Sequence, residues 1–403
     1  MNEIRIALYT NSISPHQVPL AKEIVNLVGR GAYRYIYTSP LTEERRRMGW
    51  GDLEHDWIVS EDAKPDYCRT VLNHVRFLLC GLRDFRLIEQ RAENGLETAY
   101  VSERWFKPWL GFLRIFWPPY FAMACHFVRL LSVFKEVLYF PMGIHAARDM
   151  ARLAGLLHGD ILCLFRSPEL EFDKEPYGRV WLKGHRKDDG LNRKYCLNKM
   201  RIWGYYVARS AEKKERVKWT GRETKALRLL WVGRFLRWKR VDTIIRAVCE
   251  YESRRHAVDE SLPSIVLDIY GVGRDKARLL RKAHGAESII RFHPSVKIED
   301  VRTLMRNHDV YVLSSNGAEG WGAVLNEALE EGMIVLGTVD AGSSATILDD
   351  KYKFHAGDWR RLWAMLWQMV HARSEPDTAQ ISRLSDTWSA ANAAKTLIGS
   401  KTI

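Results

Sequence analysis

The sequence VYVLSSNGAEGWGAVLNE, at residues 310–327, contains the clearest unit of secondary structure in the chain. Residues 310–313 are a continuous apolar run typical of a buried strand, and residues 322–331 have helical periodicity. Between them, two glycines bracket Trp321, so the backbone there can approach a ligand closely. The segment predicts a strand–turn–helix unit with a ligand site at its turn.

The same alternation of strands and helices extends along the chain in both directions. In the C-terminal half we predict strands at 229–232, 265–270, 289–292, 310–313 and 334–336, and helices at 241–251, 276–284, 298–306, 322–331, 359–372 and 379–398. In the N-terminal half we predict strands at 4–9, 33–37, 78–80, 98–101 and 160–165, and a helix at 19–28. This rhythm is typical of parallel sheets with helices on both faces.

Two such halves predict an α/β protein with two Rossmann-like domains that face one another across a cleft. We place the boundaries at 1–205, 206–378 and 379–403, with the last segment a helix that returns to the first domain. A chain of 403 residues is too long for one hydrophobic core. In open α/β sheets ligands bind beyond the carboxyl ends of the strands, so each domain is expected to bring one ligand site to the cleft.

Composition excludes several classes of protein. With 46% hydrophobic and 28% charged residues the chain is typical of globular proteins, not of disordered or fibrous ones. Its six cysteines form no C-x-x-C pair, which argues against a zinc ribbon or a disulfide framework and favours a reducing compartment. The first residues, MNEIRIALYT, are not typical of a signal peptide.

Charge and aromatic residues point to an anionic partner. The net charge is +13, and residues 174–225 carry +10 of it, with sixteen Lys and Arg against six Asp and Glu. The apolar region 109–134 holds a charge-free run of only fourteen residues, 115–128, whereas a spanning helix needs about 20. Its aromatics beside basic residues suit a membrane interface, and the alternative is a buried helix pair with a solvated basic face elsewhere.

Two carboxylates and two cations are the candidate groups for ligand binding and catalysis. Glu319 and Glu327 lie about 12 Å apart along a helix axis and roughly 80° round it, too far to share one metal ion readily, but suited to holding two parts of an elongated ligand. Arg234 and Lys239 follow the strand at 229–232 and can neutralise a diphosphate without a metal. The sequence Gly271-Val272-Gly273 lacks the third glycine of the dinucleotide fingerprint, which argues against a nicotinamide enzyme.

The order of these motifs resembles the donor half of family 4 glycosyltransferases, which are retaining enzymes with the GT-B fold. The resemblance runs from about residue 229 to 349 and rests on Gly-Arg-x4-Lys, Gly-x-Gly and Glu-x7-Glu, of which the last is specific. In the N-terminal half, SPHQ at 14–17, YVSERW at 100–105 and GIHAA at 143–147 are similar to the acceptor half of bacterial surface-polysaccharide members. The chain departs from the pattern with Ser314-Ser315 in place of a proline and His293-Pro294 in place of a glycine.

The resemblance implies a role for each matching residue. Glu327 would hold the ribose hydroxyls of a nucleotide sugar, Glu319 would contact the transferred sugar, and Arg234 with Lys239 would bind the diphosphate. The remaining candidate residues are Gly320, Trp321, Gly322, Ala323, Gly271 and His293 on the donor side, and Ser14, Pro15, His16, Ser102 and Glu103 on the acceptor side. His145 is a further candidate for an acceptor-side histidine.

We therefore expect a retaining glycosyltransferase that uses a UDP or GDP type nucleotide sugar as substrate and needs neither a metal nor another cofactor. The acceptor is expected to be a lipid-linked, lipopolysaccharide or capsule type glycan. The enzyme is expected to be peripheral on the inner face of the cytoplasmic membrane. The alternatives are a GT-B nucleotide-sugar epimerase and a basic protein that binds nucleic acid or glycan without catalysis. A pI of about 9.4 is what suggests nucleic acid, but no nucleic-acid-binding motif accompanies it.

Overall fold

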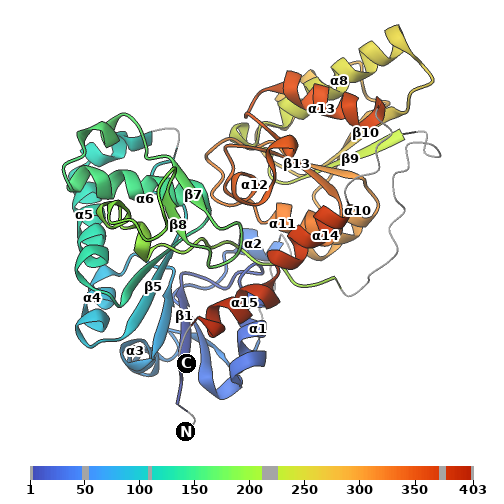
Figure 1. Cartoon of the computed structure of the whole chain (residues 1–403). Coiled ribbons are helices and arrows are strands. Elements are labelled where there is room, and N and C mark those ends of the chain that lie inside the picture. The colour runs from blue at the N-terminus through green and yellow to red at the C-terminus, as the bar shows by residue number, and fades with distance from the viewer. Residues whose placement is uncertain (1–2, 48–53, 108–110, 211–225, 372–377, 401–403) are drawn as a thin grey trace. The chain divides into compact units, whose positions relative to one another are not determined.

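The computed structural model describes residues 3–47, 54–107, 111–210, 226–371 and 378–400 (Figure 1). The chain forms two compact units: the first takes most of the chain up to Ala208 and resumes at Thr387, and the second contains Arg209–Asp386. Each unit has a parallel sheet with helices packed against it. The two predicted Rossmann-like domains are confirmed.

The first unit has a six-stranded parallel sheet with the order β3-β2-β1-β4-β5-β6. The strands β1 and β6 are buried along their whole length, as the apolar runs in their sequences require. The strand bounds are β1 Ile6–Thr10, β2 Tyr33–Tyr37, β3 Ile58–Ser60, β4 Phe77–Cys80, β5 Glu97–Ser102 and β6 Val137–Pro141.

Helices and short turns complete this unit, together with a two-stranded antiparallel hairpin, β7 Leu170–Phe172 and β8 Val180–Leu182. The α-helices are α1 Val18–Val28, α2 Glu43–Arg47, α3 Pro65–His74, α4 Phe85–Glu93, α5 Pro118–Val133, α6 Ile144–Leu157, α7 Leu191–Lys194 and α15 Ala390–Gly399. The 3-10 turns are η1 Arg30–Ala32, η2 Gly111–Phe116, η3 Ile161–Leu164 and η4 Leu197–Lys199.

The strand predicted at 160–165 is wrong, because this segment forms η3. Its backbone groups bond to the end of α6 and not to a sheet: the Asp160 N–H donates to the Gly155 carbonyl at 2.9 Å, and the Arg152 side chain donates to the Cys163 carbonyl. An apolar run this short fits a strand or a turn equally well by sequence alone.

We predicted that the aromatic region 109–134 forms either a membrane interface or a buried helix pair. In the structure, part of the region is buried and part is exposed. Trp105 and Phe127 pack in the core of the first unit, where the Trp105 indole N–H donates to the Tyr139 hydroxyl at 3.1 Å. Phe116 and Trp117, in contrast, are 69% and 63% exposed. Trp109 lies outside the described residues. Within the described ranges every helix falls short of the length and apolar character needed to span a bilayer.

The second unit has a parallel sheet with the order β11-β10-β9-β12-β13-β14. Because β9, β10 and β11 follow one another in one direction and β12 returns to the other side of β9, the strand order reverses between β9 and β12. Such a reversal is where open α/β sheets bind ligands. The strand bounds are β9 Ala226–Val232, β10 Ser264–Tyr270, β11 Ile290–His293, β12 Val310–Leu313, β13 Ile334–Thr338 and β14 Lys353–Phe354.

The helices of this unit are α8 Val241–Val258, α9 Lys276–Lys282, α10 Ile298–Arg306, α11 Val324–Glu330, α12 Gly342–Ile347, α13 Trp359–His371 and α14 Thr378–Thr387, with 3-10 turns η5 Arg237–Lys239 and η6 Asp350–Tyr352. The predicted helices correspond to α8, α9, α10, α11 and α13, although α8 extends beyond the predicted end at 251. The helix α12 was not predicted, and the prediction also differs near the C-terminus.

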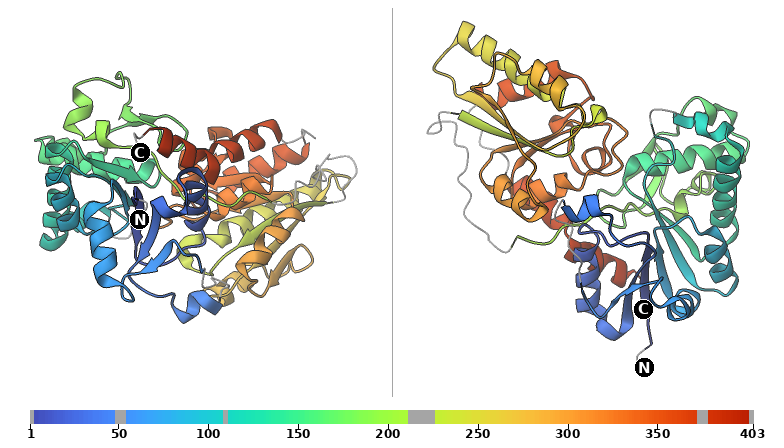
Figure 2. Two further views of the ribbon diagram at one scale, coloured as in Figure 1. Left: turned by 90° about the horizontal axis from the view of Figure 1, so that it is seen from below. Right: turned by 180° about the vertical axis from the view of Figure 1, so that it is seen from behind.

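The single helix predicted at 379–398 is wrong, since α14 ends at Thr387 and α15 begins at Ala390. The Ser389 hydroxyl accepts a hydrogen bond from the Asn392 N–H at 3.2 Å, which caps the start of α15. The helix α15 belongs to the first unit and packs against α1 (Figure 2). The break therefore separates the two units at the residues where the chain passes from one to the other.

Candidate functional site

Lys239 and Glu319 form an ion pair at the point where the strand order of the second unit reverses. Lys239 ends η5, which follows β9, and Glu319 lies in the turn after β12. Their side chains are only 16% and 13% exposed, so the pair is largely shielded from water. Two of the predicted catalytic residues, 80 positions apart in the sequence, are thus in direct contact.

Ser314 and Ser315 hold this ion pair in place. The Ser314 hydroxyl donates to the Lys239 carbonyl at 2.7 Å, and the Ser315 hydroxyl donates to Glu319 Oε2 at 2.8 Å. Thr338 in turn donates to the Ser315 carbonyl. From the sequence we noted the two serines only as a departure from the expected proline and assigned them no function, although this departure was the signal that could have found it.

The glycine-rich turn after Glu319 is fixed by packing and presents its backbone. A Cβ on Gly342 would lie 2.1 Å from the Gly320 carbonyl oxygen, so the start of α12 packs directly against this turn. Gly322 has a φ of +89°, a conformation that favours glycine. Among the described residues, the N–H groups of Gly320, Gly322 and Ala323 make no hydrogen bond. These three N–H groups remain available to a ligand.

Trp321, predicted to bind substrate, contributes its side chain to the core instead. It is 1% exposed, and its indole N–H donates to the Asn326 amide oxygen at 2.9 Å. The Ser343 N–H donates to the Trp321 carbonyl at 2.9 Å and ties the turn to α12. The indole therefore fixes the turn and does not face a ligand.

Glu327 lies on α11, where the charges of Arg302 and Glu331 act on its carboxyl. Burial raises the pKa of its carboxyl to about 7, Arg302 acts to lower it and Glu331 to raise it further. Both Glu319 and Glu327 raise the pKa of the buried Tyr311 hydroxyl, after burial itself. Tyr311 is in β12, and both predicted carboxylates therefore lie close enough to this strand to act on its hydroxyl electrostatically.

The Gly271-Val272-Gly273 turn is shaped by its contact with the turn that carries Arg234. A Cβ on Gly271 would lie 1.9 Å from the Gly233 carbonyl oxygen, and the Phe235 N–H donates to the Val272 carbonyl at 2.7 Å. Close packing of two backbone segments thus explains the glycine at 271. The Arg234 side chain is exposed on the same turn.

His293, predicted on the donor side, is part of a cluster that sequence reasoning did not find. Its Nε2 lies 2.6 Å from Asp268 Oδ1, and its ring stacks on Tyr270 at 4.2 Å. The buried His308 contacts the other oxygen of Asp268 at 3.1 Å. Burial alone would raise the pKa of the Asp268 carboxyl, but the hydrogen bonds of His308 and His293 outweigh it and lower that pKa to about 2. The cluster fixes the His293 ring at the end of β11.

The predicted acceptor-side residues lie in the first unit, beyond the carboxyl ends of β1 and β5. Ser14 accepts hydrogen bonds at its carbonyl from the first residues of α1, with Pro15 and His16 in the same turn. Burial lowers the pKa of His16 to about 4, so its imidazole is neutral at pH 7.

The second acceptor-side turn follows β5. Ser102 donates to the Glu103 carbonyl at 2.8 Å, and the Glu103 carboxylate pairs with Lys107 at 3.6 Å. Because β1 and β5 are parallel members of one sheet, this turn and the turn at Ser14 lie along the same edge of the first unit.

Within the described ranges, no group of three or more His, Cys, Asp and Glu side chains is arranged to hold a metal ion. The donor-side site instead combines a lysine, an exposed arginine, two carboxylates and three backbone N–H groups. This set can bind an anionic group at one end and stabilise positive charge at the other.

Comparison with known proteins agrees with this geometry. Residues 212–376, which lie within the second unit, match the family model described as glycosyl transferases group 1. Over 130 residues the chain is 29% identical to the GtfA subunit of the UDP-N-acetylglucosamine--peptide N-acetylglucosaminyltransferase of Streptococcus agalactiae. The match covers 32% of this chain and 23% of that relative, so the chain corresponds to less than a quarter of its length.

Solved structures resemble the whole chain. Anabaena Alr3699/HepE in complex with UDP has a TM-score of 0.61 at 10% identity, over 98% of this chain and 99% of that one. The apo form of the lipopolysaccharide outer core galactosyltransferase WaaB has a TM-score of 0.60 at 11% identity, over 98% of both chains. An E. coli trehalose-6-phosphate structure with bound UDP-2-fluoro glucose has a TM-score of 0.57 at 12% identity, over 98% of both chains. The fold is therefore GT-B.

Proposed function

We propose that the protein is a retaining glycosyltransferase that moves a sugar from a nucleotide sugar to a glycan acceptor. The observation that supports this most directly is the Lys239–Glu319 ion pair, placed at the strand-order reversal beside three backbone N–H groups without partners among the described residues. A lysine that already binds a carboxylate is suited to bind a phosphate. The matched domain and the GT-B fold agree with this function.

The chemistry follows from where charge develops. As the glycosidic bond to the nucleotide breaks, the sugar becomes positive and the leaving phosphate oxygen becomes more negative. Lys239, Arg234 and the N–H groups of Gly320, Gly322 and Ala323 would stabilise the phosphates, while Glu319 would face the sugar. Glu327 would accept hydrogen bonds from the ribose hydroxyls. Opposed charges fixed in advance stabilise both ends of such a transition state.

We infer a UDP type donor, with GDP as the second candidate, because the structurally similar HepE was solved with UDP. Thermal unfolding measured with UDP, GDP, ADP and CMP should show the largest rise in midpoint with UDP. At a hundredfold excess over its dissociation constant, a nucleotide stabilises the fold by about 2.7 kcal/mol. Lys239→Met should abolish the shift and the distant surface variant Glu287→Gln should retain it. An equal shift with all four nucleotides, or none, would contradict this assignment.

We propose that transfer is independent of metal ions. Lys239 and Arg234 supply two positive charges where the diphosphate would bind, which is the role that a divalent cation has in other transferases. Activity of the purified protein should therefore persist in excess EDTA. The measurement is the initial rate of UDP release with EDTA, and again after Mg²⁺ or Mn²⁺ is restored. A rate that falls to background in EDTA and recovers with the metal would contradict the proposal.

We further propose an acceptor that is lipid-linked or of the lipopolysaccharide or capsule type, which places the enzyme as a peripheral protein on the inner face of the cytoplasmic membrane. The exposed Phe116 and Trp117 side chains in the first unit support a surface of that kind. WaaB, a structural neighbour over the whole chain, is a lipopolysaccharide outer core galactosyltransferase.

A further inference from the structure

Large apolar side chains are exposed on two short turns of the first unit. The first group, which we name the η2 patch, consists of Leu113, Phe116 and Trp117, with exposed fractions of 56%, 69% and 63%. The second, the η3 patch, consists of Ile161, Leu162 and Phe165, with exposed fractions of 67%, 76% and 80%. Six large apolar groups exposed to this degree on two turns is more than scattered surface residues explain.

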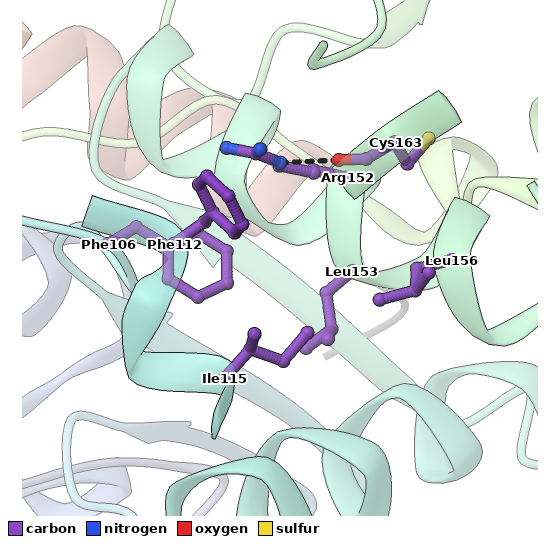
Figure 3. Close-up of a pocket in the computed structure, with 7 residues that line it drawn as sticks. All are labelled: Phe106, Phe112, Ile115, Arg152, Leu153, Leu156 and Cys163. Carbon is purple, nitrogen blue, oxygen red and sulfur yellow. Dashed lines mark hydrogen bonds between the residues drawn. The ribbon is translucent and has the colours of Figure 1, made fainter. Parts of the chain in front are cut away.

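The two turns pack against the same part of α6, as Figure 3 shows. The Arg152 guanidinium lies 4.1 Å from the centre of the Phe112 ring in η2 and also donates to the Cys163 carbonyl in η3. A hollow of about 10 Å³ between the turns is lined by side chains of both, Phe112 and Ile115 from η2 and Cys163 from η3. Because one arginine joins the turns and their inner side chains share one hollow, the η2 and η3 patches belong to a single surface.

Cations and a larger hollow adjoin the η3 patch. Arg166 and Lys183, with side chains 78% and 61% exposed, both pair with Glu169. These residues line a hollow of about 640 Å³ together with Leu162 of the patch and the exposed Leu191. The two cations and the one carboxylate that they share leave a net positive charge beside the apolar patch, which suits a surface that is apolar inside and anionic at its boundary.

Among possible occupants, these properties select an anionic lipid bilayer. The apolar groups lie on separate turns and not on one groove, so each can enter the boundary between headgroups and acyl chains. Trp117 at such a boundary keeps its indole N–H in the polar layer. The net charge of +13 attracts an anionic surface and would oppose close approach of a second copy of the same chain.

We propose that the η2 and η3 patches together form one membrane-docking surface, with η3 an obligatory half of it. This inference specifies the membrane association proposed above, and it assigns binding to residues 161–165, which lie outside both the aromatic region 109–134 and the basic stretch 174–225. Arg152 has a positioning function, since it joins the two turns without entering the bilayer itself.

Vesicle co-sedimentation tests the proposal with the full-length protein. The probes are vesicles of phosphatidylcholine alone and vesicles with equal parts of phosphatidylcholine and phosphatidylglycerol, at low and high salt. The variants are Trp117→Glu in the η2 patch, Leu162→Glu in the η3 patch, and the pair combined. Leu27→Glu is the matched control, because Leu27 is an exposed leucine of the same unit, on α1.

We expect the unaltered protein and Leu27→Glu to bind the phosphatidylglycerol vesicles and to release them at high salt. Trp117→Glu and Leu162→Glu should each lower the partition coefficient onto the vesicles roughly tenfold, because one large apolar side chain is then no longer transferred from water into the bilayer. Retention of binding by Leu162→Glu while Trp117→Glu loses it would overturn the role of η3. Equal losses in Leu27→Glu, or no binding by the unaltered protein, would overturn the surface as a whole.

Two further measurements keep the outcomes distinct. Size-exclusion chromatography with light scattering reports self-association, and a dimer that Leu162→Glu dissociates would show that a second copy, and not a bilayer, covers the surface. The UDP-induced rise in unfolding midpoint is measured for every variant. If a variant loses vesicle binding but keeps the UDP shift, the proposed transferase activity is not contradicted. If the UDP shift is absent while vesicle binding is intact, only the proposed donor site is overturned.

Discussion

Glu319→Gln is expected to lower kcat by roughly 10²–10³ while the affinity for UDP rises. In the structure the Glu319 carboxylate is paired with Lys239, and Ser315 is its second partner. A nucleotide diphosphate must therefore replace Glu319 as the partner of the lysine. The amide of glutamine removes the competing charge, which favours UDP, and also removes the negative charge that the cationic sugar needs in the transition state, which slows transfer.

The measurement pairs steady-state kinetics with calorimetric titration of UDP. Lys239→Met supplies the opposite case, because it should abolish UDP binding and leave Glu319 without its lysine. Ser315→Ala should lower kcat less than Glu319→Gln, since it loosens the position of the carboxylate without removing its charge. If UDP bound Glu319→Gln more weakly, in proportion to the fall in kcat, the carboxylate would hold the nucleotide and not compete with it.

Donor binding is expected to tighten about tenfold between about pH 6 and pH 8, a dependence that arises from Glu327. Burial raises the pKa of this carboxyl to about 7, so the protonated form prevails at pH 6 and the ionised form at pH 8. Two ribose hydroxyls donate better to the ionised form. Because folding raises the pKa of Glu327, its contribution to the stability of the folded protein falls as the pH rises through 7. Bound donor offsets that loss.

The variant Glu327→Gln isolates this effect. It should weaken donor binding at pH 8 to about the level of the unaltered protein at pH 6, flatten the pH dependence, and change kcat little, since ribose contacts are the same in the ground and transition states. A nucleotide sugar is the suitable probe, because its diphosphate does not titrate in this range. A pH dependence that persists in Glu327→Gln would assign the titration to another group.

The sequence was sufficient to predict features that depend on residues close together in the chain. The strands at 33–37 and 310–313 and the helix at 298–306 agree with the structure residue for residue, because short runs rich in apolar and aromatic residues and clear helical periodicity are local signals. Glu319, Lys239 and Glu327 could be named for the same reason, since their motifs stand at fixed positions after strands.

Features that depend on distant partners could not be predicted. The role of Ser315 depends on its hydrogen bond to Glu319, four residues later in the same turn. The Asp268 cluster joins β10 and β11 to the turn before β12 through His293 and His308. The apolar run at 160–165 has a strand-like composition, and only its bonds to α6 decide that it forms a turn. Trp321 lies in the turn that we predicted to bind a ligand, but its indole is buried, and a sequence does not show which way an indole points.

The placement of α15 also sets the order in which the protein can fold during synthesis. The buried face of α1 includes Leu20 and Ile24, and α15, which packs against α1, buries Ala393 and Leu397 in the same unit. The second unit, Arg209–Asp386, emerges from the ribosome before α15 does. The first unit is therefore the later of the two to be completed, and the part of α1 that α15 covers stays exposed until α15 has left the ribosome.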